Sequence, residues 1–250
     1  MFHILLVLAV APALFFLWFF YTRDKYEKEP LRIIFFTYVM GMMSIIPAII
    51  LETIGSAILP PTESILSIII HSFIIIGLSE EFSKLLATLP AFRSIHFNET
   101  MDGIVYGASA ALGFATIENL FYVLEGGITT GILRAILTVP GHALDGVILG
   151  YFLGLAKFNR ARRGKLILTG LGISTILHGF WDFFSLTGII IGVIVIYLIG
   201  WSLFFKYRKL ALKTSIFRRV YCIYCGTQLK NDFQYCLKCG RIRQESYRAR

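Results

Sequence analysis

Long apolar stretches, each of about the length that crosses a lipid bilayer, occupy most of this 250-residue chain. Hydrophobic residues make up 56% of it and charged residues only 16%, a composition typical of membrane proteins and not of soluble cores. We therefore predict an all-α multi-pass membrane protein in the cell membrane, with a kink at Pro47 in its second helix. The pattern predicts about seven transmembrane helices, over residues 4–21, 31–51, 64–89, 101–124, 132–156, 165–184 and 188–205.

The distribution of basic residues predicts the orientation of these helices. The loops after the first, third and fifth helices contain Lys or Arg, whereas the loops after the second, fourth and sixth contain none. Cytoplasmic loops of membrane proteins carry the excess of basic residues. Residues 206–250 add 12 basic against 2 acidic side chains at the C-terminal end. We expect the N-terminus outside the cell and the C-terminal tail in the cytoplasm.

Four cysteines in the tail have the spacing of a zinc ribbon. They form two Cys-x-x-Cys pairs separated by ten residues, and a glycine follows each pair: Cys222, Cys225, Cys236 and Cys239. This spacing is typical of structural zinc, and so small a module folds only with its metal. We accordingly divide the chain into a transmembrane domain (1–205), a basic linker (206–219), a zinc ribbon (220–241) and a basic tail (242–250).

The basic residues around the ribbon predict contact with the lipid bilayer. A run of Lys and Arg beside a membrane is attracted to anionic lipid. Nucleic-acid binding by the tail is not excluded, but it is less expected, because no aromatic-interleaved basic surface is evident. Recognition of another protein by the ribbon stays open.

An acidic pair interrupts the third apolar stretch. Glu80, Glu81 and Lys84 follow a run of almost purely aliphatic residues. An ionised side chain at the centre of a bilayer costs about 2.5–3.5 kcal/mol, so these three need partners. Either carboxylate can meet Lys84 at i,i+4 or i,i+3, and the other is then left without a counter-ion. A buried carboxylate of this kind is suited to accepting a proton from water.

Three later apolar stretches also carry ionisable side chains. Glu118 lies in the fourth, His142 in the fifth, and His178 with Asp182 in the sixth. The i,i+4 spacing lets Asp182 accept a ring N–H of His178 and leave the other nitrogen for water, metal or substrate. Asp145, three residues after His142, is expected to face either His142 or Arg134. We predict that these groups meet in one water-accessible pocket.

The order of these motifs resembles the PrsW family of intramembrane proteases, which shares a superfamily with the type II CAAX prenyl endopeptidases. The resemblance covers about residues 1–205 and rests on four motifs: Glu80-Glu81-x-x-Lys84, Phe114-x-x-x-Glu118-Asn119, His142-x-x-x-Gly146 and His178-x-x-x-Asp182. In the prenyl endopeptidases the second motif ends in His. Here it ends in Glu118, so their Glu–His pair does not transfer directly, and His142 is the candidate for the missing imidazole.

The resemblance implies cleavage of a peptide bond in or beside the membrane. Its substrates would be membrane proteins, including membrane-tethered regulators such as anti-sigma factors. Glu80 or Glu81 would be the general base, with Glu118, His142, His178 and Asp182 positioning the water or binding a metal. Two His and a carboxylate form an acceptable catalytic zinc set, and a metal-free glutamate mechanism uses the same residues.

Two other classes of function use similar residues. A proton- or metal-coupled transporter also places Glu and His at mid-membrane, although such proteins usually contain internal repeats, and none is evident here. A non-catalytic membrane scaffold would act through its zinc ribbon alone. Loss of peptide cleavage on substitution of the acidic pair separates the protease from both.

Overall fold

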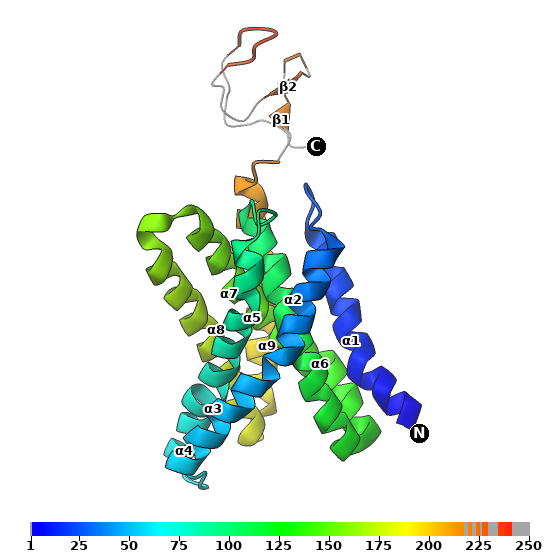
Figure 1. The fold of residues 1–250 in the computed structure, drawn as a ribbon, viewed down its shortest axis with the longest axis vertical. Helices are drawn as coiled ribbons and strands as arrows, with labels where there is room; N and C mark the ends of the chain where they lie inside the picture. Colours follow the sequence, from blue (N-terminus) through cyan, green and yellow to red (C-terminus); the bar gives the residue numbers. More distant parts are fainter. Residues whose placement is uncertain (1, 218–219, 222–223, 226, 230–234, 242–250) are drawn as a thin grey trace.

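The structure is a computed structural model that describes residues 2–217, 220–221, 224–225, 227–229 and 235–241. Its membrane part is all-helical, and a small two-stranded ladder lies beyond one end of the helices (Figure 1). In order, the elements are α1 (Phe2–Arg23), α2 (Leu31–Met43), α3 (Ile45–Ile58), α4 (Ile65–Ile70), η1 (His71–Gly77), α5 (Leu78–Arg93), α6 (Thr100–Leu133), η2 (Arg134–Thr138), α7 (Val139–Phe158), η3 (Arg160–Arg162), α8 (Arg163–Leu186), α9 (Ile190–Thr214), β1 (Val220–Tyr221) and β2 (Gln228–Leu229).

The described residues contain six continuous helical segments that are long and apolar enough to cross a membrane. One of them, Thr100–Phe158, has 59 residues. A straight helix of that length would measure about 90 Å, three times the hydrocarbon thickness. Gly127, at a φ of 73°, breaks the helical path inside this segment, and α6 then packs against α7. The fourth and fifth predicted helices are therefore one segment that folds back on itself, which gives seven crossings.

The second crossing is interrupted three residues before the predicted kink. Helix α2 ends at Met43, and α3 begins at Ile45 after Ser44. A proline removes one backbone donor and its ring clashes with the carbonyl four residues earlier. Pro47 is thus the cause of the break, but the break itself lies at Ser44.

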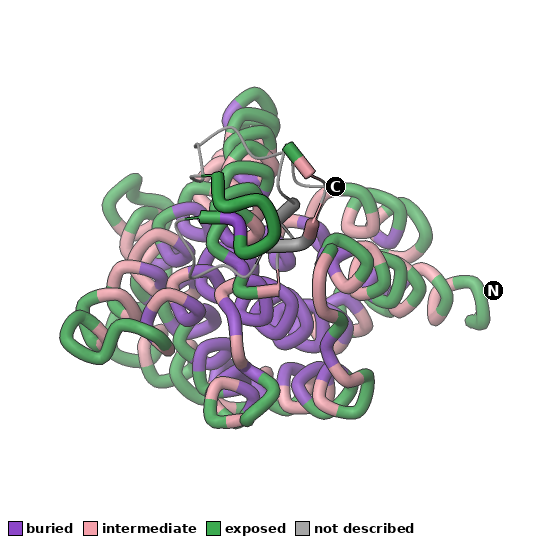
Figure 2. The backbone as a smooth tube through the Cα atoms, turned by 90° about the horizontal axis from the view of Figure 1, so that it is seen from above, coloured by how far each residue is buried: buried purple, intermediate pink, exposed green. Residues whose placement is uncertain are grey.

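Helices α6 and α7 form the centre of the bundle. Every residue from Met101 to Thr116 is buried, and Figure 2 shows this buried core surrounded by helices with exposed outer faces. Glycines let the two backbones touch: a Cβ on Gly107 would lie 2.1 Å from the carbonyl oxygen of Gly146. A Cβ on Gly150 would lie 2.0 Å from that of Gly103. This close packing fixes α7 against α6 and thereby the side chains that both helices carry.

The C-terminal part differs from the prediction at one boundary. Helix α9 continues to Thr214, so residues 206–214, which were predicted to belong to a linker, are helical. Beyond it, β1 and β2 pair antiparallel. The second Cys-x-x-Cys pair ends in a turn in which Gly240 takes a φ of 70° and its N–H donates to the carbonyl of Cys236.

Candidate active site

Two π-helical turns lead into the polar centre of the bundle. Segment η1 precedes the acidic pair on α5, and η2 precedes His142 on α7. A π-helical turn is wider than an α-helical one and occurs frequently at functional sites. At η1 the small Gly77 is required, because a Cβ there would lie 2.7 Å from the Ser72 carbonyl oxygen.

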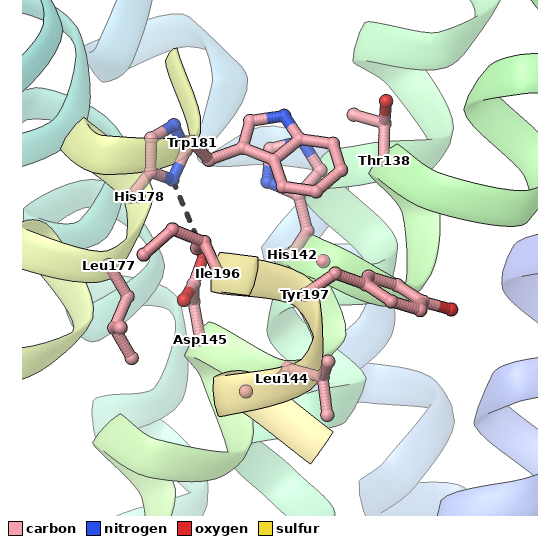
Figure 3. A pocket seen from close by; sticks show the side chains of 11 residues that line it. Thr138, His142, Leu144, Asp145, Leu177, His178, Trp181, Ile196 and Tyr197 are labelled. Atoms are coloured by element: carbon pink, nitrogen blue, oxygen red, sulfur yellow. Dashed lines mark ion pairs between the residues drawn. The ribbon is translucent and has the colours of Figure 1, made fainter. Parts of the chain in front are cut away.

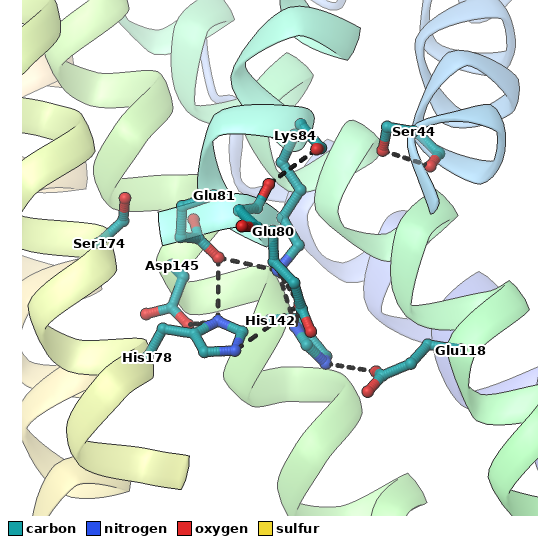
Figure 4. Close-up of polar contacts among 12 residues, drawn as sticks. Ser44, Glu80, Glu81, Lys84, Glu118, His142, Asp145, Ser174 and His178 are labelled. Carbon is teal, nitrogen blue, oxygen red and sulfur yellow. Dashed lines mark hydrogen bonds and ion pairs between the residues drawn. The ribbon is translucent and has the colours of Figure 1, made fainter. Parts of the chain in front are cut away.

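Lys84 is the counter-ion of both acidic residues. Its Nζ lies 3.0 Å from Oε2 of Glu80 and 2.8 Å from Oε1 of Glu81. All three side chains are buried, and the ammonium also lies 4.4 Å from the centre of the Phe114 ring. The sequence led us to expect one carboxylate paired with Lys84 and the other without a counter-ion, whereas in the structure both contact the same ammonium (Figure 4). The three groups together carry one net negative charge.

His142 is held by Glu118 through one ring nitrogen. Nε2 lies 2.7 Å from Oε2 of Glu118, and since a carboxylate only accepts, this nitrogen carries the proton. The same oxygen accepts from Nη2 of Arg134 at 2.7 Å, and Arg134 Nε donates to Asn119. The opposite ring nitrogen, Nδ1, is then unprotonated and accepts from Lys84 at 3.0 Å.

His178 is held in the same way by Glu81. Nδ1 lies 3.0 Å from Oε1 of Glu81, whereas Asp145 is 3.6 Å from the same nitrogen. Asp182, which the i,i+4 spacing favours as the acceptor, lies 3.4 Å from Nε2 instead. Glu81 of helix α5 is therefore closer to the His178 ring than Asp182, which lies one turn further along α8. The expectation that Asp145 faces His142 or Arg134 is wrong, because its carboxylate points to His178.

The remaining nitrogens of both imidazoles face one carboxylate oxygen. Glu80 Oε2 lies 3.6 Å from His178 Nε2 and 3.8 Å from His142 Nδ1. One ligand atom from each of these three residues lies within 4.8 Å of the others. A metal-binding His commonly donates its second N–H to a carboxylate, and both imidazoles do so here. The donor set therefore fits a catalytic metal, which would compete with Lys84 for His142 Nδ1.

An open cavity of about 430 Å³ gives access to this cluster. Glu80, Glu118, His142, His178 and Asp182 all border it, as predicted for a common pocket. Glu81 is fully buried and does not border the cavity. The two members of the acidic pair thus differ: Glu80 is accessible from the cavity, and Glu81 lies behind it.

Two further charged residues border the cavity and were not singled out from the sequence. Glu52 of α3 borders it, as does Arg134, the partner of Glu118. Glu52 stands alone near the end of an apolar run, so no sequence motif marks it as a site residue. The only available indication was its position within a membrane-length stretch, where an ionisable residue suggests function.

A second, much smaller pocket of about 20 Å³ lies on another side of the imidazoles (Figure 3). It is bordered by Asp145 and His178 and by residues of α9, including Ile196 and Tyr197. Trp181 borders both pockets.

Three cysteines of the tail also meet. Sγ atoms of Cys225, Cys236 and Cys239 lie within 4.8 Å of one another, close enough to bind a metal. Cys225 Sγ is 3.6 Å from Cys236 Sγ, much longer than a disulfide bond. Cys222, the fourth predicted ligand, lies outside the described residues.

The fold and the site together define a multi-pass membrane protein whose helices surround a cavity lined with carboxylates and imidazoles. The family described as "PrsW family intramembrane metalloprotease" matches residues 29–207 of the chain. Protease PrsW of Halalkalibacterium halodurans is 35% identical over 179 residues, which cover 71% of this chain and 81% of the relative. Protease PrsW of Bacillus subtilis is 35% identical over 182 residues (70% and 79%), and that of Geobacillus kaustophilus is 36% identical over 182 residues (71% and 77%).

No solved structure matches the chain. The match to the family covers more than half of the chain and the relatives are aligned over most of their length. The chain belongs to the PrsW family of intramembrane metalloproteases and is a membrane-embedded protease. The family resemblance predicted from the four motifs is confirmed.

Proposed function

We propose that this protease hydrolyses a peptide bond of a membrane-protein substrate in the cavity, with Glu80 as the general base. The observation that carries this assignment is that one ring nitrogen of His142 and one of His178 lie near Glu80 Oε2, at 3.8 and 3.6 Å. Glu80 also borders the cavity, whereas Glu81 does not. This difference favours Glu80 over its neighbour for contact with water and substrate.

Glu80 would act on the water that attacks the peptide carbonyl. As the water oxygen bonds to the carbonyl carbon, its proton passes to Glu80. When the C–N bond breaks, the protonated Glu80 returns that proton to the leaving amine. The products are a new carboxyl terminus and a new amino terminus, and the enzyme returns to its starting state.

The other buried charges orient the groups that meet the water. Glu81 holds His178 through Nδ1, and Glu118 holds His142 through Nε2. Lys84 supplies a counter-charge to Glu80 at 3.0 Å. Removing an orienting partner of this kind typically lowers activity or metal affinity about 10–100-fold.

Glu80, His142 and His178 would hold a catalytic zinc. Such a metal lowers the pKa of a bound water and polarises the substrate carbonyl.

The substrate we propose is a single-span membrane protein, such as a membrane-tethered regulator. The cavity lies among the membrane helices, and its borders include apolar residues such as Ile45 and Ile49 beside the charged ones. We further propose an N-terminus outside the cell and a cytoplasmic, structural zinc ribbon. The basic segment after α9 supports this orientation, which a reporter fused to the C-terminus would test.

Cleavage of a panel of single-span substrates in proteoliposomes tests the assignment of Glu80. The Glu80→Gln chain should lose activity by about 10²–10⁴-fold, the usual contribution of a general base. Glu81→Gln should lose less, because it acts through His178. Glu125→Gln is the matched control, since Glu125 is exposed and does not border the cavity. Full activity of folded Glu80→Gln would refute the proposal.

A further inference from the structure

A second group of buried carboxylates lies outside the active site, where the loop between α1 and α2 meets the start of α6. The acidic cluster consists of Asp24 in that loop, Glu99 immediately before α6 and Asp102 in its first turn. Their relative exposures are 1%, 3% and 0%, and one oxygen from each lies within 4.8 Å of the others. No known part of the proteolytic site requires acids here.

In Asp24 and in Asp102, one carboxylate oxygen accepts backbone N–H groups and the other has no hydrogen-bond partner. Asp102 Oδ2 accepts the backbone N–H groups of Asn98 and Glu99, at 2.6 and 2.7 Å, and Asp24 Oδ1 accepts that of Tyr26 at 3.3 Å. Asp102 Oδ1 and Asp24 Oδ2 are buried and have no hydrogen-bond partner. A buried acceptor without a partner is costly, so two such oxygens in one cluster indicate a missing ligand.

The basic side chains near the cluster are bonded to main-chain carbonyls instead. Lys28 donates to the carbonyls of Tyr21 and Asp24, and Arg208 donates to that of Arg23. Among the described residues, no Lys or Arg forms an ion pair with Asp24, Glu99 or Asp102. The penalty for burying an unpaired charge is several kcal/mol per ion. A cation from solution would remove that penalty.

Glu29 lies beside the cluster in a different state. It accepts the hydroxyl of Tyr106, and burial, together with the charge of Asp102, raises its pKa to about 9. Glu29 is not among the residues whose oxygens lie within 4.8 Å of one another, and we do not count it among the ligands.

We propose that Asp24, Glu99 and Asp102 bind a hard divalent cation, Ca²⁺ or Mg²⁺, that joins the α1–α2 loop to the start of α6. Both ions prefer carboxylate and carbonyl oxygens. Two ligands of one Ca²⁺ lie up to about 5 Å apart, and two ligands of one Mg²⁺ up to about 4.2 Å. Oxygens that lie within 4.8 Å of one another are close enough to share one Ca²⁺. The tail thiolates prefer softer metals, so they do not compete for either ion.

This site would stabilise the bundle at a distance from the chemistry. Helix α6 packs against α1, α2 and α7, and it carries Glu118 on a later turn. A cation at the first turn of α6 would hold α1 and α2 against this helix. We therefore expect the cation to affect the stability of the bundle more than catalysis.

Isothermal titration of the full chain in detergent with Ca²⁺ alone, and with Mg²⁺ alone, tests the proposal. We expect one hard cation per chain and a higher unfolding temperature with the ion bound. Asp24→Asn and Asp102→Asn should each weaken binding at least about tenfold, because affinity depends on the number of charged ligands. Asn at 102 keeps an oxygen that can accept the N–H groups of Asn98 and Glu99, so this variant should fold.

The control variant is Glu63→Gln, since Glu63 is exposed in the loop between α3 and α4. It should bind as the wild type does. The titration is repeated in the Glu80→Gln chain, where binding should persist although proteolysis is lost, which separates this proposal from the assignment of the base. The proposal is overturned if the wild type binds neither ion, because protons on the carboxylates would then neutralise the cluster. Equal affinity in wild type, Asp24→Asn and Asp102→Asn also overturns it.

Discussion

Replacing Lys84 with Met tests how much the ammonium of Lys84 stabilises the buried pair Glu80 and Glu81. The substitution keeps the length of the side chain but removes the ammonium that lies 3.0 and 2.8 Å from the two carboxylates. At an effective dielectric constant of about 20, each contact is worth about 6 kcal/mol before desolvation is subtracted. Breaking a buried pair usually costs about 3–5 kcal/mol net. We expect Lys84→Met to destabilise the chain by about that amount.

A double-mutant cycle with Glu81→Gln separates charge from packing. The net charge of the three groups is minus one in the wild type, zero in Glu81→Gln, minus two in Lys84→Met and minus one in the double variant. Lys84→Met should therefore be the least stable of the four, and the double variant should recover part of the loss. Activity should not recover, because the double variant still lacks the ammonium that contacts Glu80.

Unfolding in mild detergent, followed by helical circular dichroism, gives the four stabilities. Contacting charges typically show coupling energies of about 0.5–3 kcal/mol in such cycles. Additive effects, or a Lys84→Met chain within about 0.5 kcal/mol of the wild type, would refute the reasoning that Lys84 compensates both carboxylates.

Three further predictions concern packing, orientation and the tail. Gly146→Ala should destabilise the bundle by about 1–3 kcal/mol, because the new Cβ would lie 2.5 Å from the Gly107 carbonyl oxygen; thermal unfolding should show no such loss for Gly164→Ala, where nothing lies within 4 Å. Glu118→Gln should lower cleavage about 10–100-fold, because a neutral acceptor replaces the carboxylate that holds His142, and unchanged kcat in a folded variant would contradict that role. Cys236→Ser should remove a tightly bound zinc from the purified chain while α1 to α9 keep their unfolding temperature; metal analysis that finds the same zinc content in both would exclude the ribbon.

The sequence was most informative where the bilayer restricts the chain. A run of apolar residues of membrane length has to be a helix, so the seven crossings could be predicted. The meeting of Glu80, Glu118, His142 and His178 could also be predicted, because isolated charges in lipid need partners.

The pairing within the cluster could not be predicted, since it depends on how helices rotate about their axes. The i,i+4 rule assigned His178 to Asp182, but α5 turns Glu81 toward that imidazole and leaves Asp182 at the cavity. The same limitation hid Arg134, whose partner Glu118 lies 16 residues away along the chain, and placed Asp145 beside the wrong group. Glu52 joins the cavity only through the packing of α3.

Photocrosslinking of a substrate inside the cavity tests the central claim most directly. A photoreactive phenylalanine analogue is placed at Tyr122, which borders the cavity, or at the outward-facing Ile194 of α9 in a matched control. Both are introduced into the inactive Glu80→Gln chain and mixed with a single-span substrate that the wild type cleaves. We predict an adduct at Tyr122 that maps to the segment containing the cleaved bond, and little or none at Ile194. Equal adducts at both positions, or an adduct remote from the cleaved bond, would contradict proteolysis in this cavity.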